Sequence, residues 1–176
     1  MADEFISRGF SGKRRDSDQA ERIPPGQYLT GGFPVLSAGP TPQIPLETWQ
    51  FKLEPLAADP KAWSWEEFNQ LPSETFTTDI HCVTTWSKLD TKWKGVSVDT
   101  LLEDIDPDYD GQFVSVYAYG GYTTNLPLPD LLDGKAWVAT HFDGEPLTPE
   151  HGGPARLVVP HLYFWKSAKW VAGFKF

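Results

Sequence analysis

The 176-residue chain is 40% hydrophobic and 14% aromatic, and it carries a formal net charge of −9. This composition fits one folded domain with a sizeable core and excludes a disordered chain. The negative charge argues against nucleic acid or an anionic membrane surface as the main partner. Since no stretch approaches the roughly 18 consecutive apolar residues of a membrane helix, no membrane insertion is expected.

The chain is predicted to begin with a polar tail, residues 1–22, followed by a single domain over residues 23–176. The basic run KRR at residues 13–15 has no apolar stretch after it, so no signal peptide is predicted. We therefore expect a cytoplasmic protein, and a lone thiol suits a reducing compartment. Residues 23–45 are rich in proline and glycine and form either a linker or an arm that packs near a site.

Local signals predict short elements in the first half of the domain. Residues 49–53 alternate between apolar and polar types, which indicates a half-buried strand. Ser64 and Glu67 have the spacing of a capping box and predict a short helix that ends before Pro72. Residues 75–85 are predicted to be a strand that leads into a loop around the single cysteine.

The second half is also predicted to contain short elements, with a helix over residues 98–104 and strands over 113–119, 136–142, 156–159 and 170–176. The expected fold class is therefore α+β: mixed, mainly β, with a few short helices. Because the strands do not alternate regularly with long helices, a doubly wound parallel sheet is not expected.

The single cysteine, Cys82, lies in the stretch DIHCVTTWSKLDTKWKGV. One cysteine excludes an intramolecular disulfide, and the absence of CxxC pairs argues against a structural zinc site. His81 is a poor base for a Cys–His pair, because neighbours in an extended strand point to opposite faces. Two interpretations remain: a buried, inert cysteine, or a thiolate that faces a cofactor or ligand, which the polar neighbours favour.

A second candidate site is HGGPARLVVPHLYFWKSAKW, which begins at His151. Its glycines allow backbone N–H groups to approach an anion closely, and Arg156 offers a planar fork suited to phosphate. Lys166, Ser167 and Lys169 add further donors. Two interpretations remain here as well: a pocket for a phosphorylated cofactor, or a basic edge strand whose lysines are solvated.

Uncharged polar side chains follow the turn expected at Gly120 and Gly121. Tyr122, Thr123 and Asn125 supply hydroxyl and amide groups there. They either line the mouth of a substrate pocket or belong to an ordinary polar loop.

These motifs together resemble the molybdopterin-binding catalytic domain of the sulfite oxidase family, in particular its small stand-alone bacterial and archaeal branch. The resemblance is carried by RGFSGKRR, PPGQYLTGGFPVLSAGPTP, DIHCVTTWSKLDTKWKGV, GGYTTNLPL and EHGGPARLVVPHLYFWKSAKWV. It implies the fold of that domain and a molybdenum cofactor, molybdopterin with bound Mo.

The resemblance also implies roles for particular residues. Cys82 matches the thiolate that holds molybdenum and is catalytic in the family, and a soft metal suits a sulfur ligand. The expected reaction is a two-electron oxygen-atom transfer at a small sulfur-containing substrate, such as sulfite or a sulfoxide. The residues expected to bind the cofactor are Phe33, Pro34, Val35, His81, Cys82, His151, Arg156, Lys166, Ser167, Ala168 and Lys169.

The chain also departs from the family pattern. Sulfite oxidases have an arginine shortly after the metal cysteine, whereas residues 83–88 contain none, which disfavours sulfite as the substrate. No CxxCH haem motif is present, so we expect electrons to be exchanged with a separate electron-transfer protein. Relatives continue past the point equivalent to Phe176, so this chain is expected to lack a short tail or to have a more open pocket. The alternative function is a non-catalytic molybdopterin-binding module.

Overall fold

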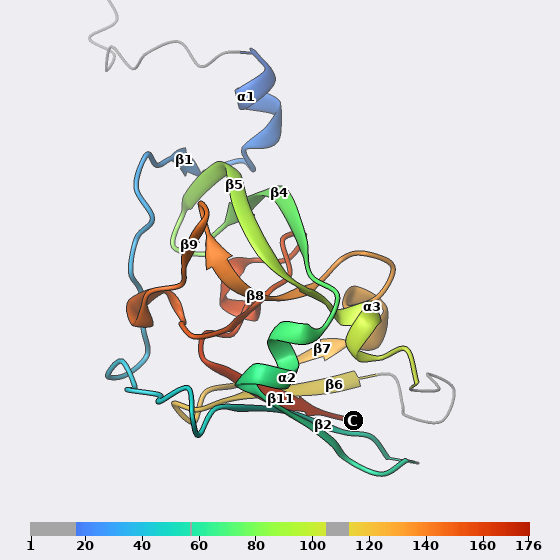
Figure 1. Cartoon of the computed structure of the whole chain (residues 1–176). Coiled ribbons are helices and arrows are strands. Elements are labelled where there is room, and N and C mark those ends of the chain that lie inside the picture. The colour runs from blue at the N-terminus through green and yellow to red at the C-terminus, as the bar shows by residue number, and fades with distance from the viewer. Residues whose placement is uncertain (1–16, 57, 105–112) are drawn as a thin grey trace, which may run out of the picture.

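The computed structural model describes residues 17–56, 58–104 and 113–176, which fold into two β-sheets with short helices at their margins (Figure 1). The expected mixed, mainly β architecture is confirmed. Most of the predicted polar tail, including RGFSGKRR, lies outside the described residues, but its last part forms helix α1 (Ser17–Arg22). None of the described helices is long and apolar enough to cross a membrane.

The larger sheet, sheet A, is built around a long hairpin. Within the described residues its hydrogen-bonded path runs β1-β5-β8-β10, with β4 paired to β5 and β9 paired to β8. The β4–β5 and β5–β8 pairs are antiparallel, whereas β1 joins β5 in parallel. The strands of sheet A are β1 (Tyr28–Leu29), β4 (Glu74–His81), β5 (Trp86–Ser97), β8 (Trp137–Phe142), β9 (Glu145–Pro146) and β10 (Arg156–Val158).

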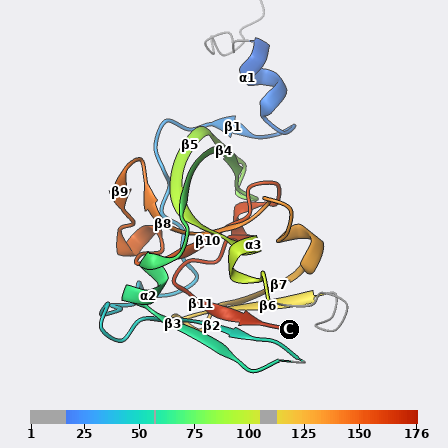
Figure 2. The same ribbon diagram turned by 45° about the vertical axis from the view of Figure 1, so that its right-hand side comes forward.

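The smaller sheet, sheet B, has the order β3-β2-β11-β6-β7. The strands are β2 (Gln50–Glu54), β3 (Lys61–Ser64), β6 (Phe113–Ala118), β7 (Thr123–Pro127) and β11 (Val171–Lys175). The remaining elements are α2 (Trp65–Gln70), α3 (Val98–Leu101) and the 3-10 turns η1 (Leu128–Asp130), η2 (Pro149–His151) and η3 (Phe164–Lys166). Figures 1 and 2 show sheet B at one end of the molecule and the β4–β5 hairpin at the other.

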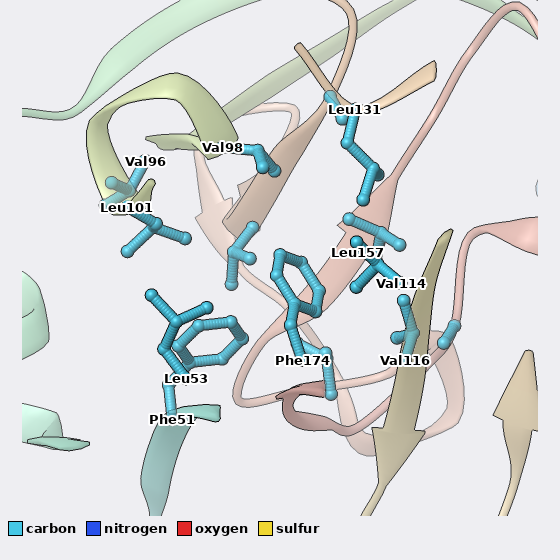
Figure 3. Packing of buried hydrophobic residues seen from close by; sticks show 14 of the residues in the cluster. Phe51, Leu53, Val96, Val98, Leu101, Val114, Val116, Leu131, Leu157 and Phe174 are labelled. Carbon is cyan, nitrogen blue, oxygen red and sulfur yellow. The ribbon is translucent and has the colours of Figure 1, made fainter. Parts of the chain in front are cut away.

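The main core lies between the sheets and follows from the alternation of side chains along the strands. Strand β2 buries Phe51 and Leu53, and β6 buries Val114 and Val116, while the residues between them are more exposed. These side chains meet Phe174 of β11 in the centre of the cluster shown in Figure 3. The alternation that predicted half-buried strands therefore also defines the inner face of sheet B.

Most of the predicted elements are confirmed. Helix α2 has the expected capping box, in which Ser64 Oγ accepts from the Glu67 amide and the Glu67 carboxylate accepts from the Ser64 amide. The strand expected over residues 75–85 was too long, because β4 ends at His81 and the chain then turns. The helix expected over 98–104 ends at Leu101.

Two further expectations were wrong. No strand was expected after the cysteine, yet residues 86–97 form β5, the longest strand among the described residues. Of the two interpretations of the polar segment around residues 123–125, the ordinary polar loop is wrong, because the segment belongs to β7 and pairs with β6.

The proline- and glycine-rich segment after α1 is an arm that runs along the side of the domain from the hairpin towards sheet B (Figures 1 and 2). Arg22 fastens its start to the hairpin, because its guanidinium donates to both oxygens of Asp79 and to one oxygen of Asp90. Strand β1 then pairs with the first residues of β5. The arm interpretation of this segment is therefore confirmed over the linker interpretation.

Candidate active site

Cys82 begins the tight turn that joins β4 to β5. Its N–H donates to the Trp86 carbonyl over 2.9 Å, and its own carbonyl accepts from the Thr85 amide over 3.0 Å. Thr85 has a φ of 74°, the left-handed conformation that often closes a three-residue hairpin loop. The turn buries Cys82, whose exposed fraction is 7%, while Val83 next to it is 57% exposed.

Side chains from three segments converge on the cysteine. Thr84 Oγ1 donates to Cys82 Sγ over 3.1 Å, and Gln27 of the arm donates its amide to the Cys82 carbonyl over 3.1 Å. Ser87, which is fully buried, donates to the Gln27 side-chain oxygen over 2.5 Å. The arm therefore holds the backbone of the residue that the family resemblance assigns to the metal.

His81 reaches this network through Ser87, since its Nδ1 lies 2.8 Å from Ser87 Oγ. The Ser87 hydroxyl proton is already donated to Gln27, so Nδ1 of His81 must be the donor in this contact. Burial lowers the pKa of His81, although Asp79 partly opposes this, and the ring is neutral at neutral pH. His81 thus supports the Cys82 backbone through two intervening side chains.

Phe33 of the arm connects the cysteine to the second predicted site. Its ring stacks on His151 with the centroids 4.0 Å apart and the planes inclined by 13°. It also contacts the rings of Trp86, Trp93 and Phe164, which share a buried cluster with Cys82. The two motifs, far apart in the sequence, therefore meet around one aromatic side chain.

The glycines after His151 are required by the shape of the chain. Gly152 has a φ of 103°, and a Cβ there would lie 3.0 Å from the backbone of Lys169. A Cβ on Gly153 would lie 2.1 Å from the Leu147 carbonyl oxygen. Only glycine allows this loop to lie so close to Lys169, whose ammonium donates to the carbonyl oxygens of Leu36 and Glu150.

Arg156 does not face solvent, as a residue that binds phosphate directly would. Its exposed fraction is 1%, and its guanidinium donates to the carbonyl oxygens of His151 and Ser167, each over 2.8 Å. The guanidinium also lies 4.1 Å from the centroid of the Phe164 ring. Arg156 therefore holds two segments of the predicted phosphate pocket together by their backbones.

The electrostatics of this region favour an anion. Burial and then Arg156 lower the pKa of Lys169 to about 8, even though Glu150 opposes the shift. Burial, Arg156 and Lys169 likewise lower the pKa of His151. The buried His151 Nδ1 and Trp86 Nε1 have no hydrogen-bond partner in the described part of the chain. Clustered cations and unpaired polar atoms suit a negatively charged, polar group.

Other predicted site residues lie in a separate group. Lys166 donates to the Asn125 carbonyl oxygen over 2.6 Å, and Tyr122 donates to the Trp165 carbonyl oxygen over 2.6 Å. Thr123 is exposed on β7 beside them. These contacts join η3 to sheet B rather than to the Cys82 cluster.

Ser167 and Ala168 are buried at the end of η3, where Ser167 Oγ accepts from the Val159 amide.

The site thus includes residues that had not been predicted. Gln27 and Ser87 are 60 positions apart, and Ser87, although it follows Cys82 closely in the sequence, reaches the Cys82 carbonyl through Gln27. Thr84 was noted only as part of a polar neighbourhood. Gln27 and Ser87 act through the tertiary contact of the arm with the hairpin, whereas Thr84 contacts the cysteine within its own turn. No motif in the sequence marks any of the three residues.

The family of the chain follows from a sequence match over residues 38–176, which fit the model described as the oxidoreductase molybdopterin binding domain. The chain belongs to this family. The predicted sulfite oxidase-like domain and its molybdenum cofactor are therefore confirmed. The match begins after the part of the arm that contains Gln27 and Phe33.

Relatives of this molybdopterin-binding domain include the uncharacterized oxidoreductase YuiH of Bacillus subtilis (strain 168). It is 44% identical over 168 residues, covering 95% of this chain and 85% of YuiH. The putative protein-methionine-sulfoxide reductase subunit YedZ1 of Azospira oryzae is 25% identical over 89% of this chain and 60% of that protein. The catalytic subunit MsrP of Gluconobacter oxydans is 28% identical over 69% of this chain, which spans 44% of MsrP.

A solved structure supports the fold independently. The sulfane dehydrogenase SoxCD from Paracoccus pantotrophus superposes with a TM-score of 0.67 at 20% identity, over 77% of this chain and 39% of that one.

Residues of the molybdopterin-binding domain described above also fit the cofactor chemically. Cys82 offers a soft ligand, and the unpaired His151 Nδ1 belongs to a ring whose pKa the nearby Arg156 and Lys169 help to lower.

The depressed pKa of Lys169 predicts a pH dependence in the cofactor-free protein. Because the folded-state pKa is about 8 and the ordinary value is 10.5, the folded chain binds fewer protons between these pH values. The free energy of unfolding should therefore rise with pH across this window. The rise should be smaller than the full pKa shift of Lys169 implies, because this side chain is partly exposed and solvent screens its charge. Urea denaturation at about pH 7 and about pH 9.5 measures it.

Two variants test the assignment of this pH dependence. Lys169→Met should reduce the rise in stability, whereas the exposed Lys175→Met should preserve it. An equal rise in wild type and Lys169→Met would contradict the assignment.

Proposed function

We propose that the chain is a molybdenum-cofactor-dependent oxidoreductase that carries out two-electron oxygen-atom transfer at a small sulfur-containing substrate. The observation that carries this proposal is that Phe33 stacks on His151 and also packs against the cluster that contains Cys82, while Arg156 and Lys169 lie close enough to His151 to lower its pKa. A molybdopterin needs a metal ligand at one end and a phosphate site at the other. The sulfoxide reductase names of YedZ1 and MsrP support a sulfur-containing substrate.

The residues take distinct roles in this proposal. Cys82 holds the metal through its sulfur, and Lys169 with the glycine loop receives the phosphate. Arg156 keeps His151 and Ser167 in place through their carbonyl oxygens and contributes its charge at close range. The bound cofactor supplies the two-electron redox chemistry.

Further residues complete the cofactor pocket in our proposal. The arm places the backbone from Phe33 to Val35 beside the pterin, and His81 supports Cys82 through Ser87. Ala168, at the end of η3, belongs to the phosphate side of the pocket in this proposal, whereas the role of Lys166, which donates to the Asn125 carbonyl oxygen, stays a prediction. The assignment of Tyr122, Thr123 and Asn125 to the substrate side of the pocket stays a prediction.

The surroundings of the sulfur favour a neutral substrate over sulfite. The polar side chain in contact with Sγ within the described residues is the hydroxyl of Thr84. Lys88, the nearest base downstream of Cys82 in the sequence, donates to the Gly31 carbonyl of the arm over 3.0 Å. A dianion would lack the guanidinium partner that the family provides for sulfite, whereas a sulfoxide needs no such charge.

Electrons are exchanged with a separate protein in this proposal. The subunit names of YedZ1 and MsrP support such an arrangement. A cytoplasmic location stays a prediction.

The proposal is tested with protein made in a host that synthesises the molybdenum cofactor. We expect molybdenum and pterin in equimolar amounts with the chain, and dye-linked reduction of methionine sulfoxide faster than oxidation of sulfite. Folded protein without molybdenum would contradict the cofactor site. Loaded protein that turns over neither substrate would instead favour the non-catalytic binding module.

A further inference from the structure

The hydroxyl of Thr84 makes a direct hydrogen bond to the sulfur that is proposed to hold the metal. Thr84 Oγ1 and Cys82 Sγ are 3.1 Å apart, and the hydroxyl is the donor. This direction is also the one that a metal-bound thiolate requires, because a thiolate has no proton and can only accept. The contact can therefore persist unchanged when Cys82 is a ligand.

The hairpin turn fixes this contact through the backbone. The N–H of Cys82 is bound to the Trp86 carbonyl, and the Cys82 carbonyl accepts from Thr85 and from the buried Gln27. Two residues after the cysteine, Thr84 projects back to Sγ, while Val83 between them points to solvent with an exposed fraction of 57%. The side chain of Thr84 is itself exposed, so the turn and not core packing sets its position.

A hydrogen bond to a metal-bound sulfur withdraws electron density from the sulfur. The sulfur then donates less to the metal, which stabilises the lower oxidation states and raises the reduction potential. We propose that Thr84 is a positioning residue that orients the Cys82 sulfur and raises the reduction potential of the metal bound there. This inference rests on the proposed function, because it requires molybdenum at Cys82.

The experiment is a redox titration of molybdenum-loaded protein, followed by electron paramagnetic resonance. Thr84→Val removes the hydroxyl and keeps the shape of the side chain. We expect the equilibrium constant for one-electron reduction of the metal to fall about tenfold, which corresponds to about 59 mV for a one-electron couple. Thr84→Ser keeps the hydroxyl and should have a reduction potential close to that of the wild type.

Thr85→Val provides the matched control, because the Thr85 hydroxyl bonds to the Thr84 carbonyl oxygen and not to sulfur. Its potential should equal that of the wild type. Equal potentials in wild type and Thr84→Val would overturn the inference, and so would equal shifts in Thr84→Val and Thr85→Val. If Thr84→Val and Thr84→Ala both fold without binding molybdenum, Thr84 serves cofactor insertion and the inference is wrong. Absence of molybdenum from the wild type would instead refute the proposed function.

Discussion

Replacing Arg156 with methionine will lower the free energy of unfolding by about 1–3 kcal/mol for each of the two buried carbonyl groups that lose their donor. The guanidinium is almost completely buried and donates to the carbonyl oxygens of His151 and Ser167. Methionine fills much of the volume but offers no donor, so both carbonyl groups lose their partner inside the protein. It also removes the cation from the face of Phe164.

Urea denaturation of the cofactor-free chain measures this loss. Lys92→Met, at an exposed position of β5, is the matched control and should change stability by less than about 0.5 kcal/mol. Arg156→Lys should be intermediate, because an ammonium on a shorter stem cannot bridge two carbonyl groups as a planar fork does. A loss for Arg156→Met no larger than that of the control would show that these buried hydrogen bonds contribute little.

The same burial changes what a charge-reversal experiment can show. From the sequence alone, Arg156→Glu and Lys169→Glu are both expected to reduce cofactor content with the fold intact. The structure keeps that expectation for Lys169, which is partly exposed, and argues against it for Arg156. A glutamate at residue 156 would place an unpaired negative charge against two carbonyl oxygens, and we expect it to prevent folding.

Local signals in the sequence were sufficient for much of the fold. The capping box at Ser64 and the alternation of β2 and β6 depend only on residues close in the chain, and the structure follows them. Strand β5 was missed for an equally local reason. The loop of residues 83–85 contains no glycine or asparagine, although Thr85 adopts the left-handed conformation that those residues favour, so the hairpin had no turn signal.

The candidate site shows a different limit of sequence reasoning. Residue types and the family resemblance predicted that Cys82, His151 and Lys169 serve one pocket, and in the structure Phe33 contacts both His151 and the cluster that contains Cys82. Residue types did not reveal that Arg156 donates to carbonyl groups. Its burial depends on how η3 packs over β10, which is a tertiary feature. The bond from Gln27 to Cys82 joins residues 55 positions apart, so only the folded arm creates it.

Replacing Cys82 with serine is expected to remove molybdenum from the protein and to abolish oxygen-atom transfer. A serine hydroxyl is a harder ligand than a thiolate and is not deprotonated at neutral pH, so it binds a soft metal site poorly. The loss of metal affinity should exceed the about 10–100-fold cost of outer-shell changes, because a direct ligand is lost. The phosphate side, with Lys169 and the glycine loop, is unchanged, and pterin should therefore remain bound.

Metal and pterin content, measured separately on the same preparations, distinguish the two ends of the site. Cys82→Ser should lose molybdenum and keep much of its pterin, whereas Lys169→Glu should lose both, because reversal of charge repels the phosphate. Thr85→Ser, in the same turn, is the control and should keep both at wild-type content. A Cys82→Ser protein that retained equimolar molybdenum would show that the Cys82 thiolate is not required to hold the metal. The buried cysteine among the aromatic rings would then be a structural residue.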